Sequence, residues 1–353
     1  NFVTVNPLFS AQEIIDYLNK VVEKELLPFE SVWRKKLLHL SGGNNELELS
    51  TFRGFVDTYK GIAESYYLGG EVVTKSKTTS IPVDNINVSE EVNAGLNQIT
   101  FFGHSAPNVT DIDIGFVSDP INGYDNKGKY PFIIMNGCNA GNIYSDDYIF
   151  GEDWILTPDK GSTDVIAHSS YGFSPILNVW SNLFYSIGYG DINYMDKSIG
   201  EIMNEVGRQM SLLIGGNINY YYITQIQQMS LHGDPAIKLF GTQQPDYEIS
   251  STNVEAVGLT DLGVTAEADS FVLHLGVRNF AAYINDSLEV FVRRTLADNT
   301  TIIDYDTIRF APARYIDTLV YVVDNNYANN SGLNSFEIVL DPANKIPELD
   351  DIS

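Results

Sequence analysis

The chain has 353 residues, of which 44% are hydrophobic, and this is enough for two domains that each bury a core. Its 46 acidic side chains outnumber 21 basic ones, which argues against nucleic-acid binding, because phosphate contacts need clustered Lys and Arg. No apolar run approaches the length of a membrane span, and a single cysteine cannot form an internal disulfide. The acidic balance is typical of a secreted or surface-held bacterial protein. The chain begins at Asn1 without Met, so we expect a mature form or an excised fragment.

The first predicted element is a helix over residues 11–22. Its apolar residues Ile14, Ile15, Leu18 and Val21 recur at the spacing of a face that packs on a core. We therefore expect this helix to bury that face against the rest of the domain.

Strands and helices then alternate up to about Phe240. Strands are predicted over residues 36–40, 71–75, 99–103, 131–137 and 164–168, and helices over about 49–66, 89–97, 175–187 and 198–213. Such alternation implies right-handed crossovers and a doubly wound, mostly parallel α/β sheet.

The pattern changes after Pro245, where strand-like runs follow one another without helical patterns between them. They cover residues 270–277, 287–293, 301–310, 316–323 and 334–340. Short strands with turn signals between them predict an immunoglobulin-like β-sandwich. The expected domains are therefore an α/β domain over residues 1–242 and a sandwich over residues 246–353.

Two of the predicted strands end at reactive residues. Residues 99–103 lead into His104, and residues 131–137 lead into Cys138, the one cysteine of the chain. Both runs lack polar alternation, which favours buried strands of a parallel sheet. If the strands are neighbours, their carboxyl ends place an imidazole and a thiol on one edge, where open α/β sheets bind ligands. An imidazole is the usual base that turns a thiol into a thiolate, so a Cys-His hydrolase is predicted.

Each of these residues also has a structural interpretation. A lone cysteine is often a small buried hydrophobe, although the glycines of Asn136-Gly-Cys-Asn-Ala-Gly141 leave room for a peptide and backbone N–H groups for an oxyanion. A histidine at a strand end is often held by hydrogen bonds. His168 competes with His104 for the role of base, because its strand ends on the same edge; we favour His104.

The residues Gly103-His-Ser105 and Asn136-Gly-Cys-Asn-Ala-Gly141 resemble the His…Cys pattern of the gingipain-like cysteine peptidases, which have the caspase-type fold. The stretches 151–161 and 231–239 are similar to that family as well. The resemblance covers about residues 8–240 and is nearest to the sortase-like peptidases of the type IX secretion system.

The resemblance implies an endopeptidase with Cys138 as nucleophile and His104 as general base and acid. The backbone N–H groups of Ser105 and Cys138 would bind the oxyanion, although the family has Gly where this chain has Ser105. An acid that orients the imidazole often follows the first strand, and Glu46 is the nearest candidate; a solvated loop carboxylate is the alternative.

A substrate pocket is expected to include the residues after the strand 164–168, namely Ser169, Ser170 and Tyr171. The expected partners are protein or peptide substrates, with secretion-system components as a further expectation. The expected location is extracellular or on the bacterial surface.

No metal or cofactor is expected to be required. The acidic stretches 111–114 and 145–147 carry oxygen ligands that suit Ca²⁺, but without a calcium-loop signature we expect solvated surface instead. Two rival functions share the sequence features. One is a catalytically silent scaffold on the same fold, and the other is a general secreted protease.

Overall fold

The computed structural model describes residues 10–29, 31–145, 148–214, 219–259 and 263–349. Its internal contacts divide the chain into two units, Asn1–Gln243 and Gln244–Ser353. No helix of the described residues is long and apolar enough to cross a membrane.

The first unit is built on a six-stranded sheet with the order β10-β9-β8-β4-β1-β2. The strands are β1 (Lys36–Ser41), β2 (Glu71–Ser76), β4 (Gln98–Phe102), β8 (Phe132–Asn136), β9 (Asp164–His168) and β10 (Met229–His232). Neighbouring strands are parallel except for the edge strand β10, which runs antiparallel to β9. This confirms the predicted doubly wound, mostly parallel sheet.

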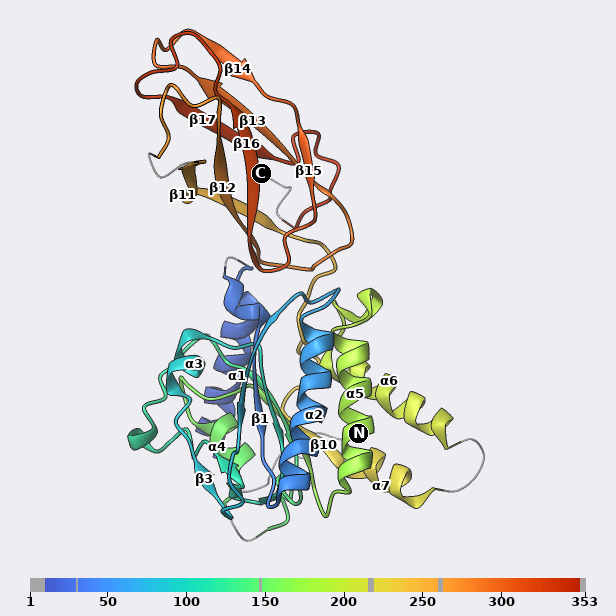
Figure 1. Ribbon diagram of the computed structural model, residues 1–353. Helices are drawn as coiled ribbons and strands as arrows, with labels where there is room; N and C mark the ends of the chain where they lie inside the picture. The colour runs from blue at the N-terminus through green and yellow to red at the C-terminus, as the bar shows by residue number, and fades with distance from the viewer. Residues whose placement is uncertain (1–9, 30, 146–147, 215–218, 260–262, 350–353) are drawn as a thin grey trace. The chain divides into compact units, whose positions relative to one another are not determined.

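Helices cover both faces of the sheet (Figure 1). One face packs on α2 (Glu46–Ala63), α5 (Ser174–Gly188) and α6 (Ile199–Leu213), and the other packs on α3 (Ser89–Ala94) and α4 (Phe150–Leu156). Successive residues of β8 point to opposite faces, so that Ile134 joins the first core and Ile133 and Met135 join the second. The remaining α-helices of this unit are α1 (Ala11–Leu26) and α7 (Tyr220–Gln228), and short 3-10 helices cover Val32–Lys35, Pro120–Asn122 and Ile192–Tyr194. Four two-residue strands complete the described elements: β3 (Asp84–Asn85), β5 (Ser105–Ala106), β6 (Val109–Thr110) and β7 (Ile112–Asp113).

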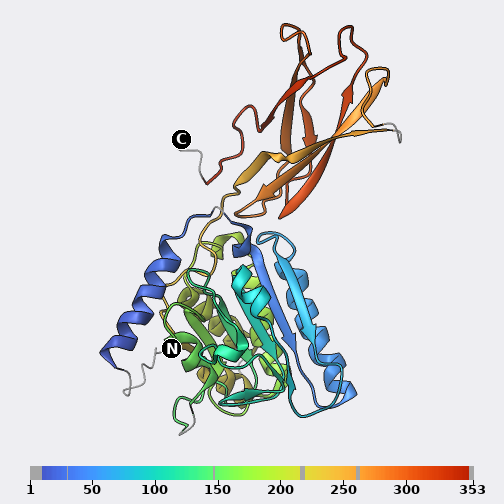
Figure 2. The same ribbon diagram turned by 90° about the vertical axis from the view of Figure 1, so that its left-hand side faces the viewer.

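Helix α1, drawn in blue at one side of the first unit in Figure 2, corrects the sequence prediction. Ile14, Ile15 and Leu18 are exposed, and the buried residues of the helix are Lys20, Val21 and Lys24. The Lys20 ammonium donates hydrogen bonds to the carbonyls of Trp154, Lys160 and Ser162. A lysine that satisfies buried carbonyls thus turns the helix away from the face that its apolar spacing favours.

The second unit is a sandwich of two antiparallel sheets. One sheet contains β11 (Tyr247–Gly258), β12 (Ser270–Asn279) and β16 (Ile316–Asp324), and the other contains β13 (Leu288–Thr295), β14 (Ile302–Asp304), β15 (Ile308–Phe310) and β17 (Ser335–Leu340). Alternate residues of β12 and β13 form the core between them. The predicted strand 301–310 is two strands, and β11 was not among the predicted strands. The immunoglobulin-like type of the sandwich stays a prediction.

A buried histidine lies at the centre of the first unit. His39 of β1 is fully buried, with Nδ1 3.1 Å from the Val56 carbonyl oxygen and Nε2 2.8 Å from the Tyr185 hydroxyl. Burial is the main reason that the pKa of His39 falls to about 3. In the folded state the His39 imidazole therefore stays neutral, whereas in the unfolded chain it binds a proton when the pH falls below its ordinary pKa of 6.5.

We expect His39→Gln to make unfolding of the first unit less sensitive to acid. Because the pKa of His39 is lower in the folded state, protons favour the unfolded chain once the pH falls below 6.5. The free energy of unfolding then falls by about 1.36 kcal/mol per pH unit, or about 2 kcal/mol by pH 5. Urea unfolding at pH 7 and pH 5 can be followed by tryptophan fluorescence, because all three tryptophans lie in this unit. The wild type should lose about 2 kcal/mol more than the variant between these pH values. His274→Gln, in the second unit, is the control. If the wild type and His39→Gln lose the same free energy of unfolding between pH 7 and pH 5, His39 does not make the first unit sensitive to acid.

Candidate active site

The register of β4 and β8 brings the two predicted reactive residues to the same edge of the sheet. Phe102 pairs with Asn136, and the Gly103 N–H donates to the Asn136 carbonyl at 3.1 Å. His104 and Cys138 each lie two residues beyond this pair. Neighbouring strands are roughly 4.8 Å apart, so the residues that carry the imidazole and the thiol follow the carboxyl ends of two adjacent strands, β4 and β8.

Cys138 is a free, half-buried cysteine. Its Sγ lies 3.8 Å from the carbonyl oxygen of Gly172, in the loop after β9. Within the described part of the chain, the Cys138 N–H makes no hydrogen bond. That N–H is therefore free to bind an oxyanion that forms beside the sulfur.

Ser105 connects the loop of His104 to the loop of Cys138. It lies in β5, which pairs with β6, and its hydroxyl donates to the Cys138 carbonyl at 2.8 Å. A Cβ at position 137 would lie 2.1 Å from Ser105 Oγ, so this approach of the two loops requires Gly137. The hydroxyl role of Ser105 was not foreseen from the sequence, which predicted only its backbone N–H as an oxyanion donor.

His104 is held by a carboxylate. Its Nε2 lies 2.9 Å from Glu48 Oε2, and the two side chains are 44% and 31% exposed. The Phe52 ring lies against the imidazole, with 5.9 Å between the ring centroids. Because a carboxylate only accepts hydrogen bonds, Nε2 carries the proton, and in the neutral imidazole Nδ1 keeps a lone pair.

The acid at the imidazole is Glu48, and Glu46 lies exposed at the start of α2. Asn45 caps this helix by accepting from the Glu48 N–H at 3.0 Å, and Glu48 accepts from the Asn44 N–H at 2.8 Å. Burial alone would raise the pKa of Glu48, but the Asn44 N–H and the His104 imidazole together lower it. The sequence Asn45-Glu-Leu-Glu48 carries a capping signal, an N-cap Asn with Glu three residues later, but the helix was predicted to begin at about Leu49.

Asp111 is buried next to the His104 loop. The prediction that residues 111–114 form a solvated acidic stretch is therefore wrong for this residue. It is buried and accepts from the Gly43 N–H at 2.6 Å, and the buried Lys77 ammonium lies 3.8 Å away. Its own N–H donates to the His104 carbonyl at 2.8 Å. Burial raises the pKa of Asp111, against the effects of Gly43 and Lys77. The carboxylate thus fixes the His104 loop to the end of β1.

The second carboxylate of that stretch is buried as well. Asp113 accepts from the backbone N–H groups of Thr110 and Gly115 at 2.8 and 2.7 Å. Its oxygens therefore stabilise the loop. Among the described residues there is no group of three or more His, Cys, Asp or Glu arranged to hold a metal ion. Asp146 and Asp147, the acids of the other stretch, lie outside the described residues.

His168, the competing base, is buried at the end of β9, and its Nδ1 lies 2.8 Å from the Ser170 carbonyl oxygen. Burial lowers its pKa, so this imidazole is held neutral for a structural reason. Ser170 also accepts from the Asn139 N–H at 2.8 Å, and the Ser169 N–H donates to the Gln228 carbonyl at 2.9 Å. The loop predicted to line a substrate pocket, Ser169, Ser170 and Tyr171, thus lies beside Cys138.

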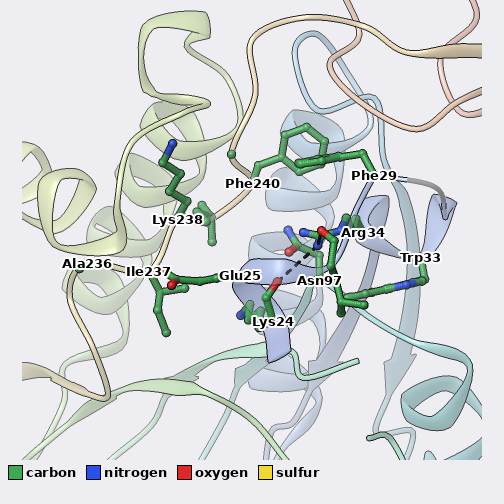
Figure 3. A pocket seen from close by; sticks show the side chains of 13 residues that line it. Lys24, Glu25, Phe29, Trp33, Arg34, Asn97, Ala236, Ile237, Lys238 and Phe240 are labelled. Carbon is green, nitrogen blue, oxygen red and sulfur yellow. Dashed lines mark hydrogen bonds between the residues drawn. The ribbon is translucent and has the colours of Figure 1, made fainter. Parts of the chain in front are cut away.

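A separate cavity of about 340 Å³ lies at the opposite edge of the sheet, next to the starts of β1 and β4 (Figure 3). It is lined by aromatic and basic side chains, among them Phe29, Trp33, Arg34 and Phe240. The Arg34 guanidinium donates to the carbonyls of Lys24 and Leu27, where α1 ends. Arg34, one of the three basic residues that line this cavity, therefore serves to end a helix.

Comparison with known proteins points to one family. A family model described as Peptidase family C25 matches residues 7–240. No curated protein sequence matches the chain significantly.

Solved structures show the same fold at low sequence identity. The chain is similar to the Arg-specific cysteine proteinase gingipain R, with a TM-score of 0.52 and 12% identity over 94% of this chain and 70% of that one. It is also similar to a structure of the pro- and mature domains of Porphyromonas gingivalis RgpB, with a TM-score of 0.50 and 11% identity over 90% and 75% of the two chains. These matches support the caspase- and gingipain-type α/β fold.

We expect Glu48→Gln to slow alkylation of Cys138 by iodoacetamide at pH 7, and Glu46→Gln to leave it unchanged. The amide keeps the size of the side chain but removes the charge that stabilises the imidazolium accompanying a thiolate. A half-exposed charged hydrogen bond is stronger than a neutral one by about 1 kcal/mol, or roughly fivefold in rate. Alkylation followed by intact-protein mass spectrometry measures both variants. Equal rates in the two variants would show that Glu48 does not act on His104.

Proposed function

The chain belongs to peptidase family C25 and is a cysteine-type endopeptidase, and we propose that Cys138 and His104 carry its chemistry. The observation that supports this most is the common register of β4 and β8, which sends both side chains to one edge. The Glu48 carboxylate on His104 Nε2 supports it further, because it leaves Nδ1 as the basic nitrogen.

In the proposed reaction, His104 Nδ1 accepts the Cys138 proton and the sulfur attacks the carbonyl carbon of the scissile bond. The negative oxygen that forms is bound by the Cys138 N–H, with the Ser105 N–H as the second proposed donor. His104 then donates its proton to the leaving amine, the C–N bond breaks, and a thioester to Cys138 remains. Water activated by His104 attacks the thioester, releases the acid and restores the thiol.

Other residues position this pair without touching the substrate. Ser105 ties the two loops together through the Cys138 carbonyl. Asp111 holds the backbone of His104 against the end of β1. These contacts fix the geometry before a substrate arrives, which is where much of the rate of an acyl-transfer enzyme originates.

We further propose that the enzyme is secreted or held at the bacterial surface and acts with components of a type IX secretion system as a sortase. The resemblance of its motifs to such peptidases and its acidic composition support this. A sortase passes the thioester to an amine, so an added peptide amine should yield a ligated product. Hydrolysis alone in its presence would favour the general secreted protease.

We expect Cys138→Ala to abolish peptide hydrolysis with little effect on folding. The substitution removes a small side chain among glycines, so unfolding should change by on the order of 1 kcal/mol. Hydrolysis of a fluorogenic peptide library and the melting temperature together test this. Activity that persists in Cys138→Ala would rule out the proposed nucleophile.

His104→Ala should slow both hydrolysis and alkylation of Cys138, by about 10²–10⁴-fold for hydrolysis. The control is His274→Ala, in the sandwich. A catalytically silent scaffold predicts a different result, namely a thiol whose alkylation does not respond to His104→Ala and no hydrolysis by the wild type.

A further inference from the structure

Every exposed aromatic side chain in the described part of the chain lies in one of three segments of the first unit. The six residues, called the aromatic rim below, are Tyr144, Tyr148, Tyr171, Phe173, Tyr220 and Tyr221. The other described aromatic side chains are at least partly buried. Exposed apolar groups that gather at one place in this way mark a binding surface.

The segment with Tyr171 and Phe173 lies beside Cys138, and the segment with Tyr220 and Tyr221 contacts it through Phe173. The residue that follows the cysteine joins the loop after β9, because the Asn139 N–H donates to the Ser170 carbonyl at 2.8 Å. The Gly172 carbonyl, between two residues of the rim, lies 3.8 Å from Cys138 Sγ.

The third segment is the start of α7, which packs on α5, the helix that begins after Phe173 (Figure 1). The ring of Phe173 stacks on that of Tyr221, with 5.1 Å between the centroids. The side chains of Tyr171 and Phe173 are nevertheless 81% and 51% exposed, so most of this aromatic surface is open to a ligand.

The order of the strands gives the rim a direction along the substrate. Strand β8, which carries Cys138, has β4 on one side and β9 on the other. His104 follows β4, and a general acid must lie beside the leaving amine. The acyl part of the substrate, which ends at the scissile carbonyl, therefore points the other way, toward Tyr171 and Phe173.

The loop beside the sulfur is uncharged, since residues 169–173 contain no Asp, Glu, Lys or Arg. Asp146 and Asp147 stand between Tyr144 and Tyr148 in the sequence, so the apolar surface next to Cys138 is that of Tyr171 and Phe173. We propose that the aromatic rim binds an aromatic or large aliphatic side chain on the amino-terminal side of the scissile bond. This inference rests on the proposed function for the direction of cleavage, and it makes the substrate class apolar.

The test uses peptides that differ at one position, with Phe, Leu, Ala, Arg or Glu before the scissile bond. An apolar side chain in a matching site discriminates by about 10–200-fold, so kcat/KM for Phe should exceed that for Ala, Arg and Glu by at least tenfold. The double variant Tyr171→Ala/Phe173→Ala should lose this preference, mainly through KM, while iodoacetamide still alkylates Cys138 at the wild-type rate. The matched control is Ile121→Ala. Ile121 is an exposed apolar residue, and the Asn93 amide donates a hydrogen bond to the Gly123 carbonyl in the turn that follows it.

A binding measurement keeps this test separate from the catalytic proposal. Fluorescence anisotropy with Cys138→Ala should give an affinity for the Phe peptide at least tenfold above that for the Arg peptide. The proposed role of the aromatic rim is wrong if the Phe and Arg peptides bind with equal affinity, or if an Arg or Glu peptide binds more tightly. It is also wrong if the double variant loses the same factor of kcat/KM for every peptide. Selective binding without hydrolysis by the wild type would instead overturn the catalytic proposal and leave the rim standing.

Discussion

The site depends on the register between β4 and β8. Phe102 opposite Asn136 fixes where each strand ends, and so determines that His104 and Cys138 leave the sheet at the same level. A shift by one residue would send one of the two side chains to the opposite face, because successive residues of a strand alternate. Both strands are buried on both faces, so the cores on either side hold this register.

The loops beyond the strands approach one another closely because glycine occupies the contact points. A Cβ at Gly42 would lie 1.9 Å from Asp111 Oδ1, and one at Gly103 would lie 2.3 Å from the same oxygen. Asp111 can therefore reach under the His104 loop to the Gly43 N–H. A buried carboxylate of this kind costs free energy to desolvate, and here it positions a functional loop.

Sequence periodicity was enough to predict the mostly parallel sheet and that His104 and Cys138 follow two of its strands, which are neighbours. It was not enough for side chains whose place depends on distant polar partners. Lys20 turns α1 around because three carbonyls from residues 154–162 face it. The burial of Asp111 depends on a glycine N–H 68 residues earlier in the chain. Glu48 differs from these, since a helix start at Asn45 would have pointed to it from local sequence alone.

The most direct test of the account is to trap the acyl-enzyme. A peptide ester that acylates faster than the thioester hydrolyses should add its acyl mass to the wild-type protein, and digestion should locate that mass on Cys138. The same ester should acylate His104→Ala far more slowly. An acyl group on any other residue, or turnover without an adduct on Cys138 at any time point, would contradict the central claim that this cysteine is the nucleophile.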